Sequence, residues 1–511
     1  MKNARLMGSL LLLGTALTSA SMARAAGPVP VTTKAATTST STATPPKTIE
    51  LNLDRAIPIP VSPSKFALKA TIFKTADNKE GWALNIPGGA PIATPAYWNN
   101  MLFVGGGYGS HEFYALDAQT GAVIWKYTTS DDGPTAAVVE DGLCAFNTES
   151  CTVFVLNAKT GKLVWQEWLG DPLMSQPAIY KGKLYIAYPA GQANFQHHPH
   201  VGNWQANKAQ KNESIDPKYS HRLLCADLKT GKHIWTHPIT ADAISAPVIS
   251  DGQVLLTCQD GTSFCIDAVT GKEVWQKANS GTSAPLATKQ GVVFTERQDR
   301  NQNAFEGLQV YGKEGLRIKD MAPAAQAAPY LHKSSEMNGL AKAKMQSLDS
   351  SVGFAAPPPA AGLGKAVGLP INNVIGGWAY QGSRVATKGD AFFYNRGTQL
   401  QSSRRSERAW TANFSGKGVV PQSQLFSPPA VGKDNLYLTS SNGHIIAVDQ
   451  KSGQLKFDYS THNPITFQPA LADGNIYWGT SDGVIMCLKT GEKDATDWTA
   501  WGGNAQHNKE E

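Results

Sequence analysis

Short runs of apolar residues, each closed by a turn, recur along most of the chain. The clearest run ends at Asp117 and is followed by Thr120-Gly121 and by a second apolar run that closes at Trp125. An aspartate that can hydrogen-bond its own backbone, followed by a glycine that can adopt a positive φ, is typical of a tight turn. The pattern therefore predicts two β-strands joined by that turn, with the tryptophan buried against a neighbouring unit.

This unit is repeated with a period of roughly 40 residues, which is typical of propellers and solenoids. Four nearly complete copies share an Asp or Asn at the start of the turn and a closing Trp; the pairs are Asp117 and Trp125, Asn157 and Trp165, Asp227 and Trp235, and Asp267 and Trp275. A looser copy places Asp449 before Phe457, and a degenerate copy places Ser402 in the Asp position and closes at Trp410. We expect the Asp and Trp positions to dock neighbouring units against each other.

Two further strands precede each copy, as in the runs around Val248 and Leu255. Four strands per unit make one blade of a β-propeller. A truncated copy that ends at Gly491 and two degenerate units, near Gly315 and Trp410, bring the count to eight. The sequence therefore predicts an all-β fold, an eight-bladed β-propeller of four-stranded antiparallel blades, with seven blades as the alternative. The segment around Trp498 suggests that strands from both ends of the chain close the ring.

These residues resemble the pyrroloquinoline-quinone-type propeller repeat family, whose Ala-x-Asp-x-x-Thr-Gly-x-x-x-Trp motif locks adjacent blades together. The resemblance covers most of the chain from about Gly88 onward and implies the propeller fold. It implies no single function, because the family includes quinoprotein dehydrogenases, the propeller lipoprotein of the outer-membrane barrel assembly machinery and proteins of unassigned role.

The N-terminal segment has the composition of an export signal. A basic start precedes the apolar run at 10–13, and residues 23–25 offer a small-residue cleavage site. We interpret 1–25 as a cleaved bacterial signal peptide, 26–48 as a disordered linker rich in Thr, Ser, Ala and Pro, and 49–511 as a single propeller domain. The mature chain is therefore expected in the periplasm or secreted, with no transmembrane segment.

Two insertions interrupt the repeat, at 189–220 and 319–370, and the second has the composition of a disordered loop. A net charge of +6 over 511 residues, without a basic stripe, argues against nucleic acid as a partner. Six cysteines leave disulfide pairing undecided, because a domain of this size can fold without bridges. We expect a monomer.

Candidate ligand-binding residues lie where the innermost strands begin, at the mouth of the predicted central channel. Gln176 and Gln468 each precede a proline at such a point, and Arg384 introduces a cation near Trp378. A guanidinium is well suited to bind a carboxylate or the acidic edge of a quinone. The alternative is that Arg384 pairs with a nearby acid and has a structural role.

Two other groups could carry chemistry. His197, His198 and His200 could bind a transition metal through imidazole nitrogens, but no carboxylate or thiol stands at a fixed spacing, so an exposed polar loop is the alternative. Glu296 could join a rim site, although we interpret it as part of a surface hairpin tip. The sequence identifies no catalytic residue.

Resemblance to quinoprotein dehydrogenases would imply adjacent cysteines over the cofactor, an aspartate base and Glu and Asn ligands to calcium. The chain has no Cys-Cys pair and no Cys-x-x-Cys-His haem motif. We therefore predict a non-enzymatic binding or scaffold protein of the cell envelope, with an envelope or secreted protein as partner and no cofactor. The alternative is a quinoprotein dehydrogenase that holds pyrroloquinoline quinone and calcium over the channel near Arg384 and Trp378.

Overall fold

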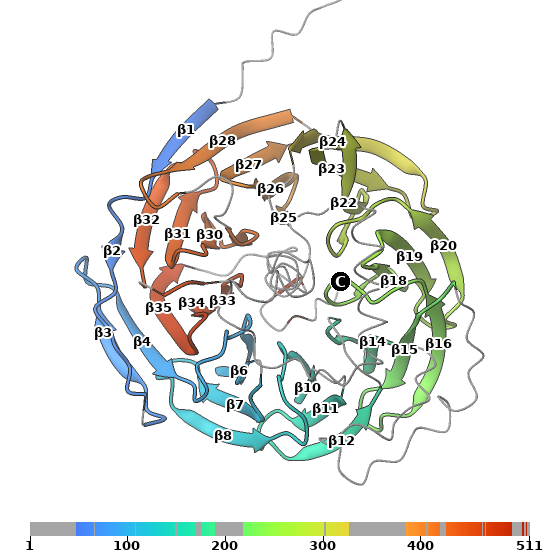
Figure 1. Ribbon diagram of the computed structural model, residues 1–511, viewed down its shortest axis with the longest axis horizontal. Coiled ribbons are helices and arrows are strands. Elements are labelled where there is room, and N and C mark those ends of the chain that lie inside the picture. Colours follow the sequence, from blue (N-terminus) through green and yellow to red (C-terminus); the bar gives the residue numbers. More distant parts are fainter. Residues whose placement is uncertain are drawn as a thin grey trace, which may run out of the picture. The chain divides into compact units, whose positions relative to one another are not determined.

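The computed structural model describes residues 47–492 except for 66, 108, 149–151, 170–174, 190–217, 301–302, 327–384, 405–406, 420–425, 462 and 466, and it also describes 503, 504 and 507. All of these residues lie in one structural unit, Pro46–Glu511. Every regular element in this part of the chain is a β-strand, and the strands form eight separate sheets. Figure 1 shows the sheets side by side around a central axis, as the blades of a propeller.

Blades 1 to 4 each contain four consecutive antiparallel strands, which follow one another from the axis outward. Blade 1 consists of β5 (Ala96–Trp98), β6 (Met101–Gly105), β7 (Glu112–Asp117) and β8 (Val123–Thr128). Blade 2 consists of β9 (Val138–Glu140), β10 (Leu143–Asn147), β11 (Thr152–Asn157) and β12 (Leu163–Trp168). Blade 3 consists of β13 (Ala178–Tyr180), β14 (Lys183–Pro189), β15 (His221–Asp227) and β16 (His233–Ile239). Blade 4 consists of β17 (Val248–Ser250), β18 (Gln253–Thr257), β19 (Thr262–Asp267) and β20 (Glu273–Ala278).

Blades 5 to 7 follow the same plan. Blade 5 consists of β21 (Leu286–Thr288), β22 (Gly291–Arg300), β23 (Asn303–Tyr311) and β24 (Arg317–Gln326), so β24 runs into the segment predicted as the second insertion. Blade 6 consists of β25 (Val385–Lys388), β26 (Ala391–Arg396), β27 (Gln399–Arg404) and β28 (Glu407–Ser415). Blade 7 consists of β29 (Ala430–Val431), β30 (Asn435–Thr439), β31 (His444–Asp449) and β32 (Leu455–Ser460).

Blade 8 closes the ring with strands from opposite ends of the described chain. Its inner strands are β33 (Ala470–Ala472), β34 (Gly474–Gly479) and β35 (Val484–Glu492), and its fourth strand is β4 (Glu80–Asn85). Strands β4 and β35 are antiparallel, with Val484 opposite Asn85. Closure by strands from both ends is therefore as predicted, whereas Trp498, expected to take part, lies outside the described residues. The predicted eight blades are confirmed.

Three short strands near the start of the described chain lie on the rim and add a fifth strand to blades 6, 7 and 8 (Figure 1). Strand β1 (Lys47–Asn52) runs parallel to β28, and β2 (Ile57–Pro58) runs parallel to β32. Strand β3 (Thr71–Lys74) is antiparallel to β4. These additions were not predicted from the sequence.

Both faces of each blade are apolar and pack on the neighbouring blades. In blade 2, Val153 and Val155 pack towards blade 3, whereas Phe154 and Leu156 pack towards blade 1. The two sets belong to the same strand because successive side chains of a strand point to opposite faces. The core is therefore a ring of seams between blades, with no separate centre.

The tryptophan that ends each motif reaches the next blade and donates a hydrogen bond from its indole N–H to a backbone carbonyl in the turn. The donor and acceptor pairs are Trp82 and Ala118 (3.0 Å), Trp125 and Ala158 (2.9 Å), Trp165 and Leu228 (2.8 Å), Trp235 and Ala268 (3.2 Å), Trp275 and Lys313 (2.9 Å), and Trp410 and Gln450 (3.0 Å). Six of the eight seams carry this bond.

The turn that receives the tryptophan is shaped by the motif's acidic residue and its glycine. In blade 1, Asp117 Oδ1 accepts hydrogen bonds from the backbone N–H of Thr120 (2.8 Å) and from its hydroxyl (2.8 Å). Gly121 has a φ of +70°, and a Cβ there would lie 2.5 Å from the ring of Trp82. Glycine is therefore required twice, for the backbone conformation and for the close approach of the ring.

The remaining two seams have another residue in the tryptophan position. Lys319 lies opposite Val310 in blade 5, and Phe457 lies opposite Ala447 in blade 7. The corresponding pair in blade 1 is Trp125 opposite Ala115. Neither replacement has an indole N–H to donate across the seam.

Blade 6 corrects one assignment made from the sequence. Ser402 lies opposite Trp410, which is the register position of Ala115 opposite Trp125, so Ser402 does not occupy the Asp position. Eight residues separate Ser402 from Trp410, whereas ten separate Ala115 from Trp125. The prediction was wrong because the turn of blade 6 is two residues shorter than those of the four nearly complete copies.

The five cysteines that the structure describes are buried and form no disulfide; they are Cys144, Cys225, Cys258, Cys265 and Cys487. Burial raises the pKa of the Cys225 thiol to about 11, so this thiol is protonated and unreactive near neutral pH. Over the same described residues, no helix has the length and apolar character needed to cross a membrane.

We predict that two glycines of blade 4 respond differently to substitution by alanine. Gly252 and Gly271 have φ values of +72° and +70°, but a Cβ at Gly252 meets nothing within 4 Å, whereas one at Gly271 would lie 2.6 Å from the Trp235 ring. Gly252→Ala should lower the free energy of unfolding by about 1–2 kcal/mol because of the left-handed backbone. Gly271→Ala should cost about 1–3 kcal/mol more, because the ring must move. Denaturant unfolding of both variants checks this, and equal losses would show that the Trp235 ring does not need the glycine.

Candidate functional site

The axial end of the propeller is the place where a ligand would meet several blades at once. The segments that lead into the innermost strands contain small, hydroxyl or amide residues; these are Thr94, Thr135, Ser175, Ser245, Ser283, Ser427 and Gln468. All of them are buried. We call these residues the inner ring.

Hydrogen bonds tie the inner ring from one blade to the next. Asn147 of blade 2 donates to the carbonyl of Ser175 before blade 3 (2.9 Å), and Asn395 of blade 6 donates to the carbonyl of Ser427 before blade 7 (2.7 Å). Thr94 donates its hydroxyl hydrogen to the carbonyl of Gln468, across the seam between blades 1 and 8 (2.8 Å). These polar groups therefore stabilise the ring, and they are not presented to solvent.

The two glutamines predicted as channel-mouth ligands occupy different blades. Gln468 donates from Nε2 to the carbonyl of Pro429 (3.0 Å), which links blades 7 and 8. Gln176 is 2% exposed, and its Oε1 accepts no hydrogen bond within the described part of the chain. Arg384 and Trp378 lie outside the described residues, so the predicted constellation stays a prediction.

Three buried acids lie near the axial end, each in a different part of the chain. Asp131, in the loop after blade 1, accepts a hydrogen bond from the hydroxyl of Thr148 in blade 2. Asp242 lies in the loop after blade 3. Glu296 of blade 5 accepts bonds from Asn279 (3.0 Å) and from the Tyr311 hydroxyl (2.5 Å). Each acid lies beside a different blade.

Glu296 is 7% exposed in the middle of β22, so its interpretation as part of a surface hairpin tip was wrong. The cause is the length of the blade 5 hairpin, whose strands extend to Arg300 and Asn303, beyond the length of the other copies. The local sequence around Glu296 carries no signal of that extension.

The metal-ligating side chains of the described residues are scattered over the blades. Within the described ranges no group of three or more His, Cys, Asp and Glu side chains gathers closely enough to hold a metal ion. His197, His198 and His200, the predicted metal candidates, lie in the gap at 190–217. We therefore derive no chemistry through a metal or a quinone.

A buried histidine and aspartate are hydrogen-bonded to each other in blade 7. His444 Nδ1 lies 2.7 Å from Asp458 Oδ1, and the residues are 9% and 5% exposed. Burial raises the pKa of Asp458, although His444 acts in the opposite direction. The Ser440 hydroxyl accepts from the backbone N–H of His444 (3.1 Å) and not from its ring. The two residues therefore link adjacent strands. They do not form a Ser-His-Asp triad, because the serine hydroxyl does not contact the imidazole ring.

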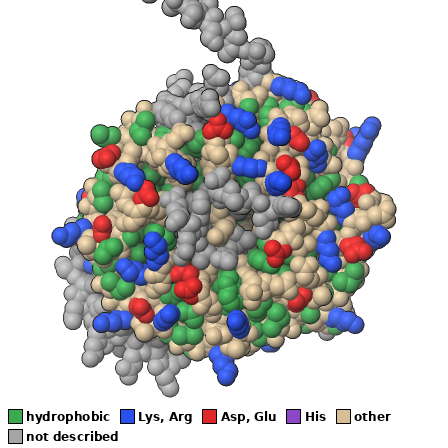
Figure 2. All heavy atoms as spheres, turned by 180° about the vertical axis from the view of Figure 1, so that it is seen from behind, with side chains coloured by type: hydrophobic (Ala, Val, Ile, Leu, Met, Phe, Trp, Pro, Cys, Tyr) green, Lys and Arg blue, Asp and Glu red, His purple; other side chains and the backbone are tan. Residues whose placement is uncertain are grey.

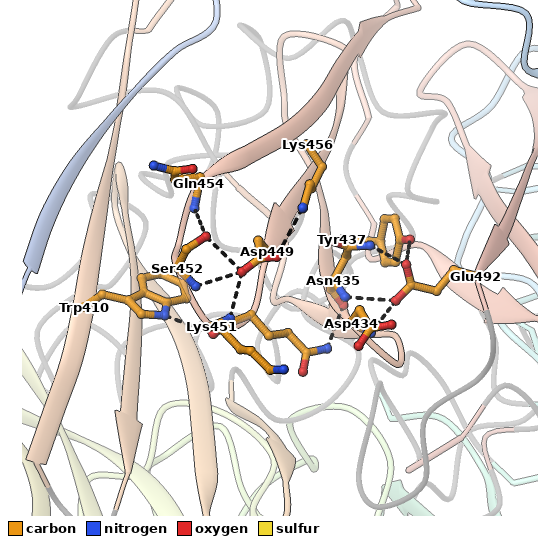
Figure 3. Close-up of polar contacts among 11 residues, drawn as sticks. Trp410, Asp434, Asn435, Tyr437, Asp449, Lys451, Ser452, Gln454, Lys456 and Glu492 are labelled. Atoms are coloured by element: carbon orange, nitrogen blue, oxygen red, sulfur yellow. Dashed lines mark hydrogen bonds and ion pairs between the residues drawn. The ribbon is translucent and has the colours of Figure 1, made fainter.

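A polar site that joins blades 7 and 8 is centred on Glu492 (Figure 3). Its carboxylate accepts hydrogen bonds from the backbone N–H of Asp434 (2.6 Å) and of Asn435 (2.8 Å), from the Asn435 amide, and from the Tyr437 hydroxyl (2.7 Å). Burial raises the pKa of Glu492, but these donors outweigh burial and hold the pKa below its usual value. Because the seam between blades 7 and 8 lacks a docking tryptophan, Glu492 provides a polar link there.

Glu492 could not be identified from the sequence because its partners are 55 to 58 residues earlier in the chain. His507 was missed for the same reason: its Nδ1 donates to the carbonyl of Ala137 in blade 2 (2.7 Å), 370 residues away. Burial lowers the pKa of His507 to about 3, so its ring is neutral near pH 7. Local sequence carries no signal for either contact.

Basic and acidic side chains are interspersed over the face shown in Figure 2. No extended field of one sign covers the described part of this face. This distribution agrees with the small net charge of the chain and does not suggest binding to a polyanion.

The eight blades and their tryptophan docking define a β-propeller of the pyrroloquinoline-quinone-type repeat class. The chain belongs to the PQQ_2 family, described as outer membrane protein assembly factor BamB, whose model matches residues 69–195, 215–312 and 395–506. The family resemblance predicted from the repeated motif is therefore confirmed.

Individual relatives are distant. Tetrathionate hydrolase of Acidithiobacillus ferrooxidans is 21% identical over 380 residues, which cover 68% of this chain and 71% of that protein. The outer membrane protein assembly factor BamB of Moranella endobia is 22% identical over 285 residues, which cover 48% and 71%. The crystal structure of BamB from Moraxella catarrhalis has a TM-score of 0.50 at 13% identity, over 82% of this chain and 97% of that one, and shows the shared fold alone.

We predict that the link centred on Glu492 depends on pH. A carboxylate whose pKa is lowered by folding stabilises the protein above its unfolded pKa of about 4.3, and this contribution is lost as the pH falls through the lowered folded value. At pH 7, Glu492→Gln should therefore lower the free energy of unfolding by about 1–3 kcal/mol. The difference from the wild type should shrink as the pH falls below about 4.

Urea unfolding between pH 3 and 8 measures this difference. The matched control is Glu314→Gln, because Glu314 is exposed; it should change stability little at any pH. A constant difference for Glu492→Gln across the range would contradict a contribution from the charged carboxylate.

Proposed function

We propose that this chain is a non-enzymatic β-propeller that binds a protein partner in the cell envelope after export. The observation that carries the proposal is that polar side chains in and near the inner ring are already hydrogen-bonded within the protein. Thr94, Asn147 and Asn395 bond from blade to blade, and Glu296 is bonded within blade 5 and its approach loop. An enzyme of this fold would instead need convergent polar groups aimed at a substrate.

Family membership supports the same proposal. Members related to this chain include outer membrane protein assembly factors, as their name states. A rigid ring with broad faces and a long rim is suited to protein binding, because loops and strand edges can be presented without rearrangement of the core. Export to the periplasm, with the segment 1–25 as signal peptide, belongs to this proposal.

A hydrolase is the second candidate. The alignment with tetrathionate hydrolase extends over 380 residues, so that relative shares most of the propeller with this chain. A site of that kind could not use Thr94, Asn147 or Asn395 freely, because these side chains are hydrogen-bonded between blades.

We expect the purified full chain to fail three tests of enzymatic activity. After incubation with pyrroloquinoline quinone and calcium and removal of free quinone, its absorbance should show no retained cofactor. It should not reduce an artificial dye with alcohols or sugars, and it should not consume tetrathionate. Retained quinone with dye reduction would favour the dehydrogenase, and tetrathionate consumption would favour the hydrolase.

The complementary experiment is in-cell cross-linking followed by purification from envelope fractions. A discrete protein partner should be recovered with the wild-type chain. Recovery of none, under conditions in which the chain itself is folded and exported, would contradict the binding role.

A further inference from the structure

The seam between blades 5 and 6 differs from the others in how its outer strands meet. Blade 5 has Lys319, opposite Val310, in the position from which a tryptophan reaches the next blade. The turn of blade 6 that would receive the ring is two residues shorter than the turn of blade 1. The indole contact that docks six other seams therefore cannot form between these two blades.

Blade 6 also turns a polar surface towards blade 5. On the third strand of each blade, counted from the axis, the two residues that flank the one opposite the tryptophan position face the preceding blade. In six blades both are apolar or aromatic; the pairs are Tyr114 and Leu116, Phe154 and Leu156, Leu224 and Ala226, Phe264 and Ile266, Ile446 and Val448, and Met486 and Leu488. Blade 5 has Gln309 and Tyr311. Blade 6 has Gln401 and Ser403, each 3% exposed, so both of its positions are polar.

Alternation along β27 decides which seam each of its side chains enters. Ser402 lies opposite Trp410, whose indole docks on blade 7. Successive side chains of a strand point to opposite faces, so Gln401 and Ser403 enter the seam with blade 5. Gln401 donates from Nε2 to the side chain of Gln399 (3.3 Å), but its buried Oε1 accepts no hydrogen bond within the described part of the chain. A buried acceptor without a donor destabilises the closed seam.

Near the axis the same seam is apolar. Val385, Phe392 and Tyr394 belong to the same buried cluster as Val310 of blade 5. They lie on β25 and β26, the two strands of blade 6 closest to the axis (Figure 1). No described residue of the outer strands β27 and β28 belongs to that cluster. The seam therefore has an apolar inner half and an outer half in which blade 6 contributes polar side chains.

We propose that the propeller opens reversibly at the outer half of the seam between blades 5 and 6, while the inner half of that seam stays packed. The movement separates β27 and β28 from the outer strands of blade 5. It is a local opening, of the kind that exposes part of a protein without unfolding the rest. This movement occurs whether or not the protein-binding role proposed above is correct.

Opening costs less at this seam than at a seam docked by tryptophan. When the seam opens, water can donate to the Gln401 Oε1, which is buried without a donor when the seam is closed. At a docked seam, opening breaks the indole hydrogen bond, such as the one from Trp235 to the Ala268 carbonyl (3.2 Å). It also exposes the ring and apolar side chains to water. The seam between blades 5 and 6 should therefore open before the docked seams.

Thiol labelling at two neighbouring positions of β27 tests the opening in the purified full chain. Ser403→Cys places a thiol in the seam between blades 5 and 6, and Ser402→Cys places one in the seam that Trp410 docks. The two serines are 3% and 1% exposed, so either thiol is protected while its seam is closed. Under native conditions, the thiol introduced by Ser403→Cys should react about tenfold faster, or more, than the thiol introduced by Ser402→Cys. Peptide mass spectrometry identifies the labelled cysteine.

Native cysteines provide internal controls in both variants. Cys225, Cys265 and Cys487 are buried, and each lies opposite a docking tryptophan. Their labelling should therefore require unfolding of the chain. Low concentrations of urea separate the two routes, because labelling through a local opening changes little with urea, whereas labelling through global unfolding accelerates steeply.

A second substitution tests the physical cause. Gln401→Met keeps an unbranched side chain of similar length and removes the buried amide. Combined with Ser403→Cys, it should slow labelling about threefold or more, because the closed seam no longer buries an acceptor without a donor. Equal labelling of the two introduced thiols, whether both are protected or both react quickly, would overturn the proposal. A steep urea dependence for the Ser403→Cys thiol, or labelling unchanged by Gln401→Met, would also overturn it.

Discussion

The docking of a tryptophan ring on the turn of the next blade is the contact on which this propeller depends. A four-stranded sheet with two apolar faces cannot bury both by itself, so each blade needs a neighbour on either side. The indole meets this need in one step, because its ring covers the turn glycine and its N–H satisfies a turn carbonyl, as Trp125 does with Gly161 and Ala158. A buried indole that lacked this acceptor would lose much of its stabilising effect.

The seams that depart from this scheme show how the ring tolerates exceptions. Where Phe457 replaces the tryptophan between blades 7 and 8, the carboxylate of Glu492 links the same two blades. The inner ring adds further bonds near the axis, including the one from Thr94 to Gln468 across the closure. Stabilising contacts are therefore distributed around the circle.

This distribution also shapes what the molecule can do. Polar groups near the axis are largely engaged in holding blades together, and the cysteines that the structure describes are buried within the sheets. The rim is different, because strands β1 and β2 demonstrate that its edges accept additional strands. This difference between the interior and the rim is what the proposed role in protein binding rests on.

The sequence by itself determined the repeated unit and the all-β class, and it favoured eight blades over seven. It could do so because the Asp-x-x-Thr-Gly turn and the strands beside it depend on residues that are close along the chain. The residue assignments within degenerate copies were less accurate. In blade 6 the turn is shortened by two residues, so Ser402 does not occupy the Asp position. Only the tertiary structure decided the fifth strands on the rim, the burial of Glu296 and the contacts of Glu492 and His507. The fifth strands and the contacts of Glu492 and His507 join segments far apart in the sequence, and the burial of Glu296 follows from the length of its hairpin. No local pattern encodes them.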